Sequence, residues 1–422
     1  MTFPTVTVQV AFDKRVTEAA TDGDFTTVTA ANPVRQFVIK RGKANVLDTI
    51  QAGTAVMIFD DANGNLDPEN TSSPYYASGK TKVLPMRHLR IVAVDPVTTT
   101  SHILFWGFIE GWESNYGKSG LDQVAKCTAV DSFKTYSLAK GPFGVAGAGV
   151  LRAEEGSGDR VEYLMGLTAE DTSTADVVEA DDLDVAAKTY TADMSMLTEM
   201  QAIDTAEVGF FYVSRSNVTT FKNRGSRVAQ FSDKQGTFTD GSTVPADTFS
   251  YDFVEFSRDD EQIINRADSV IHGGGAGTTA NDTDSQADYG VRSLTNSDLM
   301  LTTKPAATVW NDYAINRLAN PEARVRSIQW IQGADANDDR WAPLLAGDLG
   351  ELYQVDRTTP AGTAITALVL TEQITHQVKA GKWTTSWALS SADDEVYWVL
   401  DDGSGTYADW SELGVTTRLF FG

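Results

Sequence analysis

The first third of the chain alternates apolar and polar residues with the period of β-strands. Val6, Val8 and Val10 alternate with threonine and glutamine, and a period of two places one set of side chains on one face of a strand. Further apolar runs, separated by polar turn segments, lie at 55–59, 89–94, 103–112 and 121–130. Closely spaced strands with short polar turns predict a small β-sandwich or barrel.

An Asn63-Gly64 pair follows the run at 55–59. Both residues tolerate positive φ, so the pair predicts a β-hairpin. The acidic residues from Asp60 to Asp67 also raise the possibility of a calcium loop. The EF-hand frame fails, because Phe59 would be its first ligand and no glutamate falls at the twelfth position. We favour a hairpin turn with acidic flanks, with a weak cation site as the alternative.

The middle of the chain introduces helices. Met196, Met200 and Ile203 share one face of a helix predicted at 194–206, which a hairpin with strands at 210–213 and 218–221 follows. A second helix is predicted at 305–319, because proline suits a first turn and Asn320-Pro321 ends it. Further strands are predicted at 251–255, 267–271, 325–331, 349–355, 364–376 and 383–389, and a polar loop at 273–288.

A Gly/Ala-rich segment at 141–149 is the best candidate for a domain boundary. We predict an N-terminal β-barrel domain at 1–140, a mixed α/β domain at 141–235, a second barrel with an inserted loop and helix at 236–392, and an extension at 393–422. The segments 105–129 and 370–389 both give an apolar strand, a Gly-Lys turn and an alternating strand. This echo suggests two similar barrels.

The charge balance is acidic, with 34 Lys+Arg against 58 Asp+Glu and a formal net charge of -24. Such a surface repels phosphate, which disfavours stable binding to nucleic acid or anionic membranes; its default role is solubility. The single cysteine, Cys127, excludes an internal disulfide. We expect neither a signal peptide nor a membrane helix.

The sequence gives little sign of catalytic chemistry. The four histidines, His88, His102, His272 and His376, have no metal-ligand spacing, and nucleophile-elbow and phosphate-loop motifs are missing. Acidic pairs are frequent, as expected with 58 acids, and the cluster Lys40-Arg41-Lys43 is too small to indicate nucleic-acid binding. We therefore predict a protein that is not an enzyme, with no catalytic residues, cofactor or metal site.

An ordered set of short motifs runs through nearly the whole chain. Its members are Arg41, Gly42, Leu47, Asp48, Gly53, Asp60, Asp67, Pro68, Ser73, Pro74, Tyr75, Tyr76, Gly107, Trp112, Tyr289, Gly290, Arg292 and Trp383. This order resembles the minor tail proteins, or tail-tip hub proteins, of bacteriophages that infect actinobacteria.

The resemblance implies a mainly β fold, with two barrels similar to the tail-tube fold, inserted α/β elements and a small mixed middle domain. It also implies a trimeric hub ring at the virion's tail tip, made in the host cytoplasm. That ring would close the tail lumen, contact the distal tail protein, the tape-measure protein and other tip proteins, and open for DNA. The alternatives are a receptor- or glycan-binding tail module, a cell-wall hydrolase and a distal tail adaptor.

Overall fold

The computed structural model describes residues 3–44, 48–117, 123–141, 149–167, 176–179, 183–224, 234–240, 248–258, 260, 263–274, 277–320, 324–332 and 340–392. The predicted boundary at 141–149 and the extension at 393–422 therefore lie wholly or mostly outside the described residues. No helix in the described ranges is both long enough and apolar enough to span a membrane.

A first unit contains six main strands. They are β1 (Thr5–Ala11), β3 (Val34–Gly42), β4 (Gln51–Asp60), β7 (His88–Val94), β8 (Ser101–Asn115) and β9 (Val124–Val130). Their hydrogen-bonded order is β1-β7-β8-β9-β4-β3, and every pair is antiparallel. Val8 and Val10 are fully buried, so the alternation in the first strand is confirmed. The short strand β2 (Thr26–Thr27) extends the edge at β1.

A second unit repeats this arrangement. Its strands are β17 (Thr237–Thr239), β19 (Phe253–Ser257), β23 (Arg324–Gln332), β24 (Leu352–Thr358), β25 (Ala364–Lys379) and β26 (Lys382–Ser391). Their order is β17-β24-β25-β26-β23-β19. Numbered along the chain, the six strands of either unit follow the order 1-4-5-6-3-2. One difference is that β17 runs parallel to β24 and to the short strand β18 (Thr248–Ser250).

The sheet of the second unit curls around an aromatic cluster. Phe238 on β17 lies 4.9 Å from Trp330 on β23 and 5.5 Å from Trp387 on β26, centroid to centroid. Three strands separate β17 from β23 in the hydrogen-bonded order. Contact between rings on these two strands therefore requires a strongly curved sheet, with the rings on its inner face.

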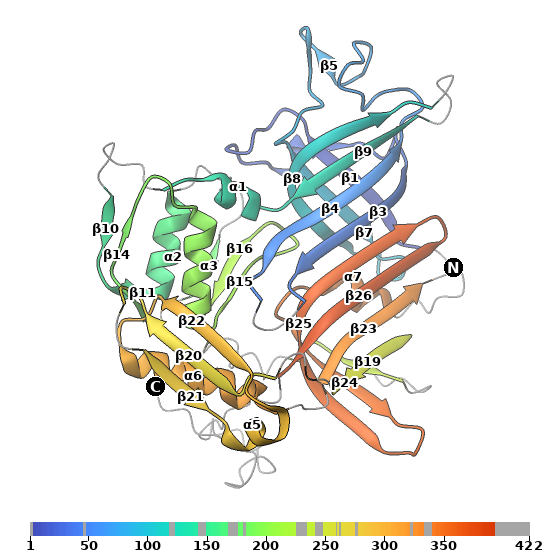
Figure 1. Cartoon of the computed structure of the whole chain (residues 1–422). Coiled ribbons are helices and arrows are strands. Elements are labelled where there is room, and N and C mark those ends of the chain that lie inside the picture. Colours follow the sequence, from blue (N-terminus) through green and yellow to red (C-terminus); the bar gives the residue numbers. More distant parts are fainter. Residues whose placement is uncertain are drawn as a thin grey trace, which may run out of the picture.

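The two units share one continuous sheet, because β3 of the first unit pairs with β25 of the second (Figure 1). Along one edge, β25 pairs with β24 up to Leu370 and with β3 from Gln373 onward. Glu372 lies at the changeover, where the register between β25 and β26 shifts. One long strand thus belongs to both units.

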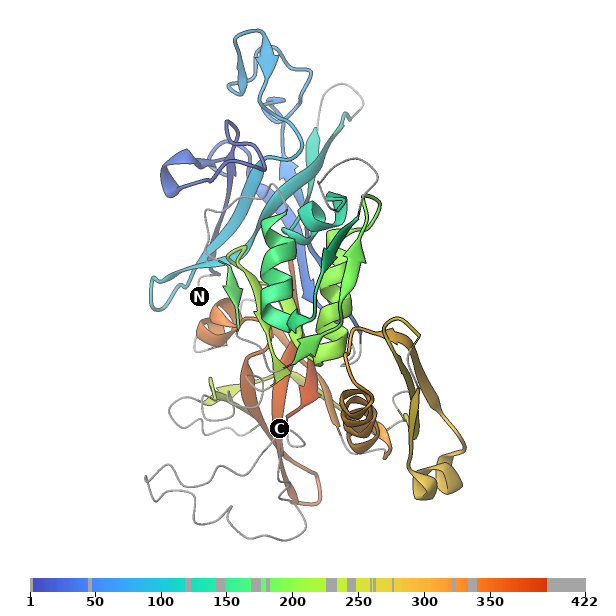
Figure 2. The ribbon, with the colours of Figure 1, turned by 90° about the vertical axis from the view of Figure 1, so that its left-hand side faces the viewer.

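Two further groups of elements, a middle group and a small inserted group, lie on one side of this sheet (Figures 1 and 2). The middle group contains the helices α1 (Phe133–Leu138), α2 (Ser157–Gly166) and α3 (Met196–Glu207), together with the strands β10 (Val150–Arg152), β11 (Glu155–Gly156), β12 (Val177–Val178), β13 (Asp184–Val185), β14 (Lys188–Tyr190), β15 (Phe210–Val213) and β16 (Thr219–Lys222). The predicted helix at 194–206 and the hairpin after it are confirmed.

A small inserted group lies between β19 and β23 in sequence. It contains β20 (Arg266–Ile271), β21 (Thr278–Asn281), α5 (Thr283–Tyr289), β22 (Ser293–Leu299) and α6 (Lys304–Leu318), and it has its own core around Trp310. The predicted helix at 305–319 is confirmed. The predicted polar loop at 273–288 is wrong, because β21 pairs with β20 and α5 follows it.

The hairpin predicted at Asn63-Gly64 is also wrong. Gly64 does have φ +64°, as the turn requires, but β4 pairs with β3 and β9 and not with the next strand. The chain continues into a small hairpin, β5 (Tyr76–Ala77) and β6 (Lys80–Thr81). A last short helix, α7 (Trp341–Ala346), packs its Trp341 ring 5.2 Å from that of Trp383.

Candidate functional site at the joint between the two units

A buried ion pair connects the two units beside the shared strand. Arg41, on β3, has a side chain only 2% exposed, and its Nη1 lies 2.6 Å from Oδ1 of Asp348, in the turn before β24. An isolated buried guanidinium would be strongly unfavourable, so its partner fixes where the turn can lie relative to β3. Arg41 is therefore a connector between units and not part of a nucleic-acid-binding cluster.

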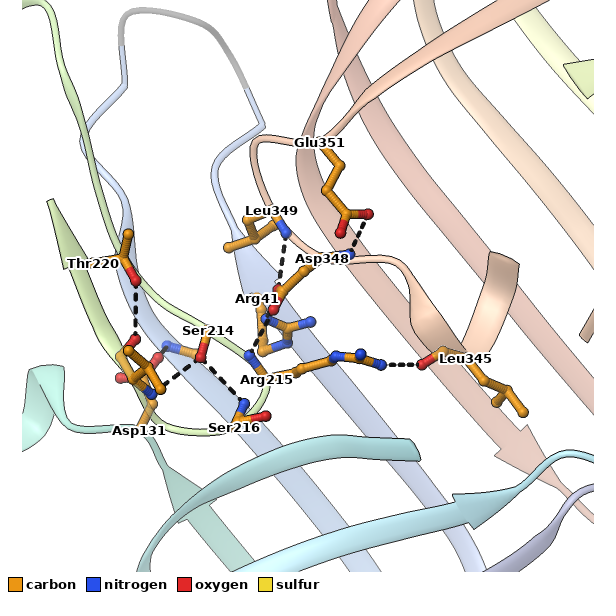
Figure 3. Close-up of polar contacts among 12 residues, drawn as sticks. Arg41, Asp131, Ser214, Arg215, Ser216, Thr220, Leu345, Asp348, Leu349 and Glu351 are labelled. Atoms are coloured by element: carbon orange, nitrogen blue, oxygen red, sulfur yellow. Dashed lines mark hydrogen bonds and ion pairs between the residues drawn. The ribbon is translucent and has the colours of Figure 1, made fainter. Parts of the chain in front are cut away.

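The same aspartate also holds the middle group in place (Figure 3). Arg215, in the turn between β15 and β16, donates its backbone N–H to Asp348 Oδ2 at 3.1 Å. Its guanidinium donates to the carbonyl oxygen of Leu345 at 2.6 Å. One carboxylate thus receives bonds from both sides, and three sequence-distant parts of the chain meet at this joint.

A second carboxylate supports the turn. Glu351 accepts the backbone N–H of Asp348 at 2.9 Å and the hydroxyl of Tyr353 at 2.8 Å. Burial raises the pKa of Glu351 and of Tyr353, with the neighbouring carboxylates adding to the effect at the tyrosine. The carboxylate is held in place by donors that shape the turn before β24.

The seam itself requires glycine at position 42. Gly42 has φ +96°, and a Cβ placed there would lie 2.0 Å from the carbonyl oxygen of Glu372. The next residue, Lys43, donates its backbone N–H to that carbonyl at 2.9 Å, and its Nζ lies 3.8 Å from Glu372 Oε2, with both side chains buried. The Arg41-Gly42 motif therefore has a structural explanation: it forms the contact between the units.

On the first unit's side, Asp131 directly follows β9 and ties it to β4. Its carboxylate accepts the backbone N–H of Gly53 at 2.6 Å and that of Phe133, in α1, at 3.0 Å. Burial raises the pKa of Asp131 to about 7, although these two bonds and Arg41 act in the opposite direction. The aspartate thus links the sheet to the first helix of the middle group.

The buried histidine of the joint is structural. His376 on β25 lies with Nδ1 3.0 Å from the hydroxyl of Thr385 on β26. Burial lowers its pKa to about 3, and the charge of Arg41 adds to the effect. The imidazole is neutral at ordinary pH and packs 6.1 Å from the ring of Trp383.

Most of the other motif residues hold turns or pack within the cores. In the loop after β4, Asp67 accepts the hydroxyl of Tyr116 at 2.7 Å, and Ser73 donates to the Asn65 carbonyl at 2.6 Å. Tyr75 stacks on Phe12 at 4.2 Å. Asp60 pairs with Arg35 across 3.5 Å; Pro68 and Pro74 lie within this loop, and Tyr76 begins β5.

Elsewhere, Gly107 lies against β9, where a Cβ would be 2.2 Å from the carbonyl oxygen of Val130. Trp112 packs 6.1 Å from Phe59.

Tyr289 and Gly290 end α5, and the buried Asn265 donates to the Gly290 carbonyl and accepts the Arg292 N–H, each at 2.8 Å. Trp383 lies 5.7 Å from Phe37 across the seam. Asp48 is exposed, and Leu47 lies outside the described residues.

The sequence did not identify the acceptors at this joint: Asp348, Glu351 and Glu372. Asp348 and Glu372 lie more than 300 residues from their first-unit partners in the chain, and Arg41 and Asp348 are separated by 307 positions. No local pattern marks them, because a Gly-Asp-Leu-Gly-Glu segment before a strand is typical of an ordinary polar turn.

The candidate reactive groups are dispersed. Cys127 is fully buried on β9, and burial raises the pKa of its thiol. His88 is buried between the backbone carbonyls of Arg15 and Glu18, each 3.0 Å from Nε2. His272 lies at the surface 2.7 Å from Asp298. In the acidic loop after β4, the Asp61 carboxylate accepts Asn32 Nδ2 at 2.7 Å and the Leu66 N–H at 3.2 Å, which is the geometry of a capped turn.

No family model matches the chain, and no curated protein sequence matches it. Solved structures do match. The tail protein from Neisseria meningitidis MC58 aligns with a TM-score of 0.58 at 10% identity, covering 92% of this chain and 97% of that one. The 43 kDa tail protein of prophage MuSo2 from Shewanella oneidensis aligns with a TM-score of 0.51 at 9% identity, with the same coverages of 92% and 97%.

This chain has a tail-protein fold. The predicted mainly β class with inserted α/β elements is confirmed, and so, at the level of the fold, is the predicted relation to tail proteins. Both matched structures are tail proteins. The similarity extends over almost the full length of both chains, so the two units, the middle group and the inserted group form one architecture.

Proposed function

We propose that this chain is a structural component of a phage tail tip, a hub protein that forms a trimeric ring around the end of the tail lumen. The motif order resembles minor tail proteins of phages that infect actinobacteria, and the fold is shared with tail proteins over 92% of the chain. The work of such a protein is mechanical: it holds neighbouring proteins in a fixed geometry and changes that geometry once, when DNA leaves.

One observation carries the proposal. Two units with the same strand order, 1-4-5-6-3-2, are joined in one chain by pairing of β3 with β25. Three chains would then supply six similar units, which can match a sixfold tube on one side and a threefold tip on the other. We keep the division into 1–140, 141–235, 236–392 and 393–422 as part of this proposal.

The joint suits a part that must not deform under load. Arg41, Asp348 and Arg215 fix the units and the middle group through buried charge-assisted bonds, which are stronger and more directional than neutral ones. A ring assembled from such two-unit blocks would close the lumen until a neighbour forces the blocks apart. The proposed neighbours are the distal tail protein, the tape-measure protein and other tip proteins.

The acidity of the chain fits this role. With a net charge of -24, carboxylates on the inner wall would repel phosphate, so DNA would pass in transit without adhering. A ring whose inner wall proved neutral or basic would rule out this part of the proposal.

The proposal is tested by locating the chain in the virion that encodes it. Gold-labelled antibodies against the purified chain should bind at the tail tip, and an antibody against the main tube protein gives the matched control along the shaft. Label on fibres away from the axis would support a receptor- or glycan-binding module. Clearing of host cell wall by the purified chain would support a hydrolase, and label one ring above the tip a distal tail adaptor.

A further inference from the structure

The contact between the two units inside the chain gives a template for a contact between chains. In the second unit, the last part of the fifth strand, β25, accepts the second strand of the other unit, β3, along Gln373 to Val378. The contact joins a strand of one unit to the free edge of the next. Because the units have the same strand order, the first unit also has a fifth strand with such an edge, and the second unit also has a second strand that could pair with it.

The equivalent receiving edge lies on β8. Both fifth strands pair with their sixth strands, and both have a register shift at a glutamate: Glu110 in β8, and Glu372 in β25. Beyond the shift, β8 pairs with β9 on one side along Gly111 to Asn115. On the other side, β7 pairs only up to Phe108, and no strand among the described residues follows it.

The two glutamates show what is missing at β8. The side chain of Glu372, which lies next to β3, is 1% exposed, whereas that of Glu110 is 44% exposed. Tyr116, just past the end of β8, is 62% exposed. An uncovered strand edge with an exposed aromatic beside it favours pairing with another strand.

The equivalent inserting strand is β19. It is the second strand of its unit, as β3 is of the first, and it pairs with β23 alone among the described strands. Its first residue, Phe253, is 60% exposed. In the second unit, β19 is therefore the equivalent of β3, the strand that the first unit contributes to the internal contact. In the first unit, the free edge of β8 is the equivalent of the β25 edge that receives β3.

We propose that β19 of one copy pairs antiparallel with the last residues of β8, Glu113–Asn115, in the next copy. The register follows from the internal contact. In the first unit, moving from each residue to its partner on the next strand leads from Gly111 in β8 to Val38 in β3. In the second unit, the same steps lead from Gln373 in β25 to Glu255 in β19. Val38 and Glu255 therefore occupy equivalent places. Because Val38 lies opposite Gln377, four residues after Gln373, Glu255 lies opposite Asn115.

This contact is head-to-tail. Each copy inserts β19 into one neighbour and receives β19 from the other, so the contact generates a ring when its rotation closes. Within the ring, contacts inside and between chains alternate and are built from equivalent strands. The inference rests on the proposed hub function and names the surface through which copies of the chain associate.

The test uses engineered cysteines at the predicted facing positions. Facing residues of an antiparallel pair have Cα atoms about 4.5–5.5 Å apart, which lies within the range that a disulfide spans, about 4.4–6.8 Å. The full chain carrying Asn115→Cys and Glu255→Cys should form cross-linked dimers and a closed trimer on a non-reducing gel. Both positions are exposed, and the native Cys127 is buried and unreactive.

Leu151→Cys combined with Glu255→Cys is the matched control, because Leu151 is 68% exposed and lies on the short strand β10. We expect at least about a tenfold lower cross-linked fraction for this control, since only a specific strand pair holds two thiols within reach. Sedimentation of the same samples gives the oligomeric state independently.

Three results would overturn the inference. A trimer in sedimentation without the 115–255 cross-link would place the interface elsewhere and leave the hub function intact. Equal cross-linking of both cysteine pairs would show random collision. A chain that stays monomeric and does not cross-link at the highest soluble concentration would exclude self-association through this edge, whereas the antibody location in the virion would still decide the hub function.

Discussion

The two units have one topology but different interiors, and a single pair of positions shows the difference. Following the pairings from the fifth strands, Cys127 on β9 and Trp387 on β26 are equivalent, and both are fully buried. The indole of Trp387 lies 5.0 to 5.5 Å from the rings of Tyr353, Trp330 and Phe238. In the first unit, Cys127, Leu89 and Val8 take the places of Trp387, Tyr353 and Phe238, and only Trp330 has an aromatic counterpart, Phe59. Strand order and register are therefore shared by the two units, whereas the volumes of individual core side chains are not.

The largest expected effect comes from emptying the aromatic core. Trp387→Ala should lower the free energy of unfolding of the second unit by about 3–5 kcal/mol, because a large cavity replaces the indole. Cys127→Ala, at the equivalent position, removes one buried atom and should cost about 1 kcal/mol. Urea unfolding followed by hydrogen exchange in each unit measures both; equal losses would contradict the difference between the cores.

The next effect concerns the joint. Arg41→Ala leaves Asp348 partly buried without its cation and should cost about 3 kcal/mol, at the low end because the Leu349 and Arg215 N–H donors remain. Arg35→Ala on the same strand is the control: its pair with Asp60 is exposed, with side chains 36% and 43% accessible, and is worth about 0–1 kcal/mol.

Beyond stability, Arg41→Ala should uncouple the two units. In the wild-type chain, β3 and β24 should lose their protection from hydrogen exchange at the same denaturant concentration. In the variant, the two strands should lose it at different denaturant concentrations. A variant in which the two strands still lose protection together would show that β3–β25 pairing alone joins the units.

The smallest effect is a dependence on pH that differs in sign between the units. The pKa of His376 is about 3 when folded against 6.5 for the free side chain, so its contribution to stability is present above pH 6.5 and is lost as pH falls toward 3. The pKa of Asp131 is about 7 against 3.8, so its contribution is present below pH 3.8 and is lost as pH rises toward 7. Each slope is at most about 1.4 kcal/mol per pH unit.

Acidification from pH 7 to pH 5 should therefore weaken the second unit and strengthen the first. Hydrogen exchange corrected for intrinsic rates, read separately on β26 and β9, measures the two slopes. His376→Gln should flatten the slope of β26 and leave that of β9 unchanged; a slope that persists in this variant would assign the effect to another group.

The sequence predicted elements whose own residues carry the pattern. The alternation in β1, the apolar faces of α3 and α6, and the hairpin of β15 and β16 were all predictable, because burial of one face imposes a period on the residues. The segment at 278–289 was missed since its strand is Thr-Thr-Ala-Asn and its helix buries only Ser285. Neither has an apolar period to detect.

The joint could not be predicted for a different reason. The sequence marked Arg41 and Gly42 through their resemblance to a motif, but a motif gives no partner, and Asp348 and Glu372 lie more than 300 residues away in the chain. The equivalence of the units was visible only as a faint echo, because the equivalent positions hold Cys127 and Trp387, or Val38 and Glu255. Equivalence became evident from strand order, which no single residue encodes.

The most direct test of the central claim is an electron-microscopy map of the intact tail that resolves strands at the tip. The account predicts three copies around the lumen, six units with alternating contacts, and β19 of each copy beside β8 of the next. A chain that lies off the axis, or a ring in which the two units of a copy do not occupy equivalent positions, would contradict it.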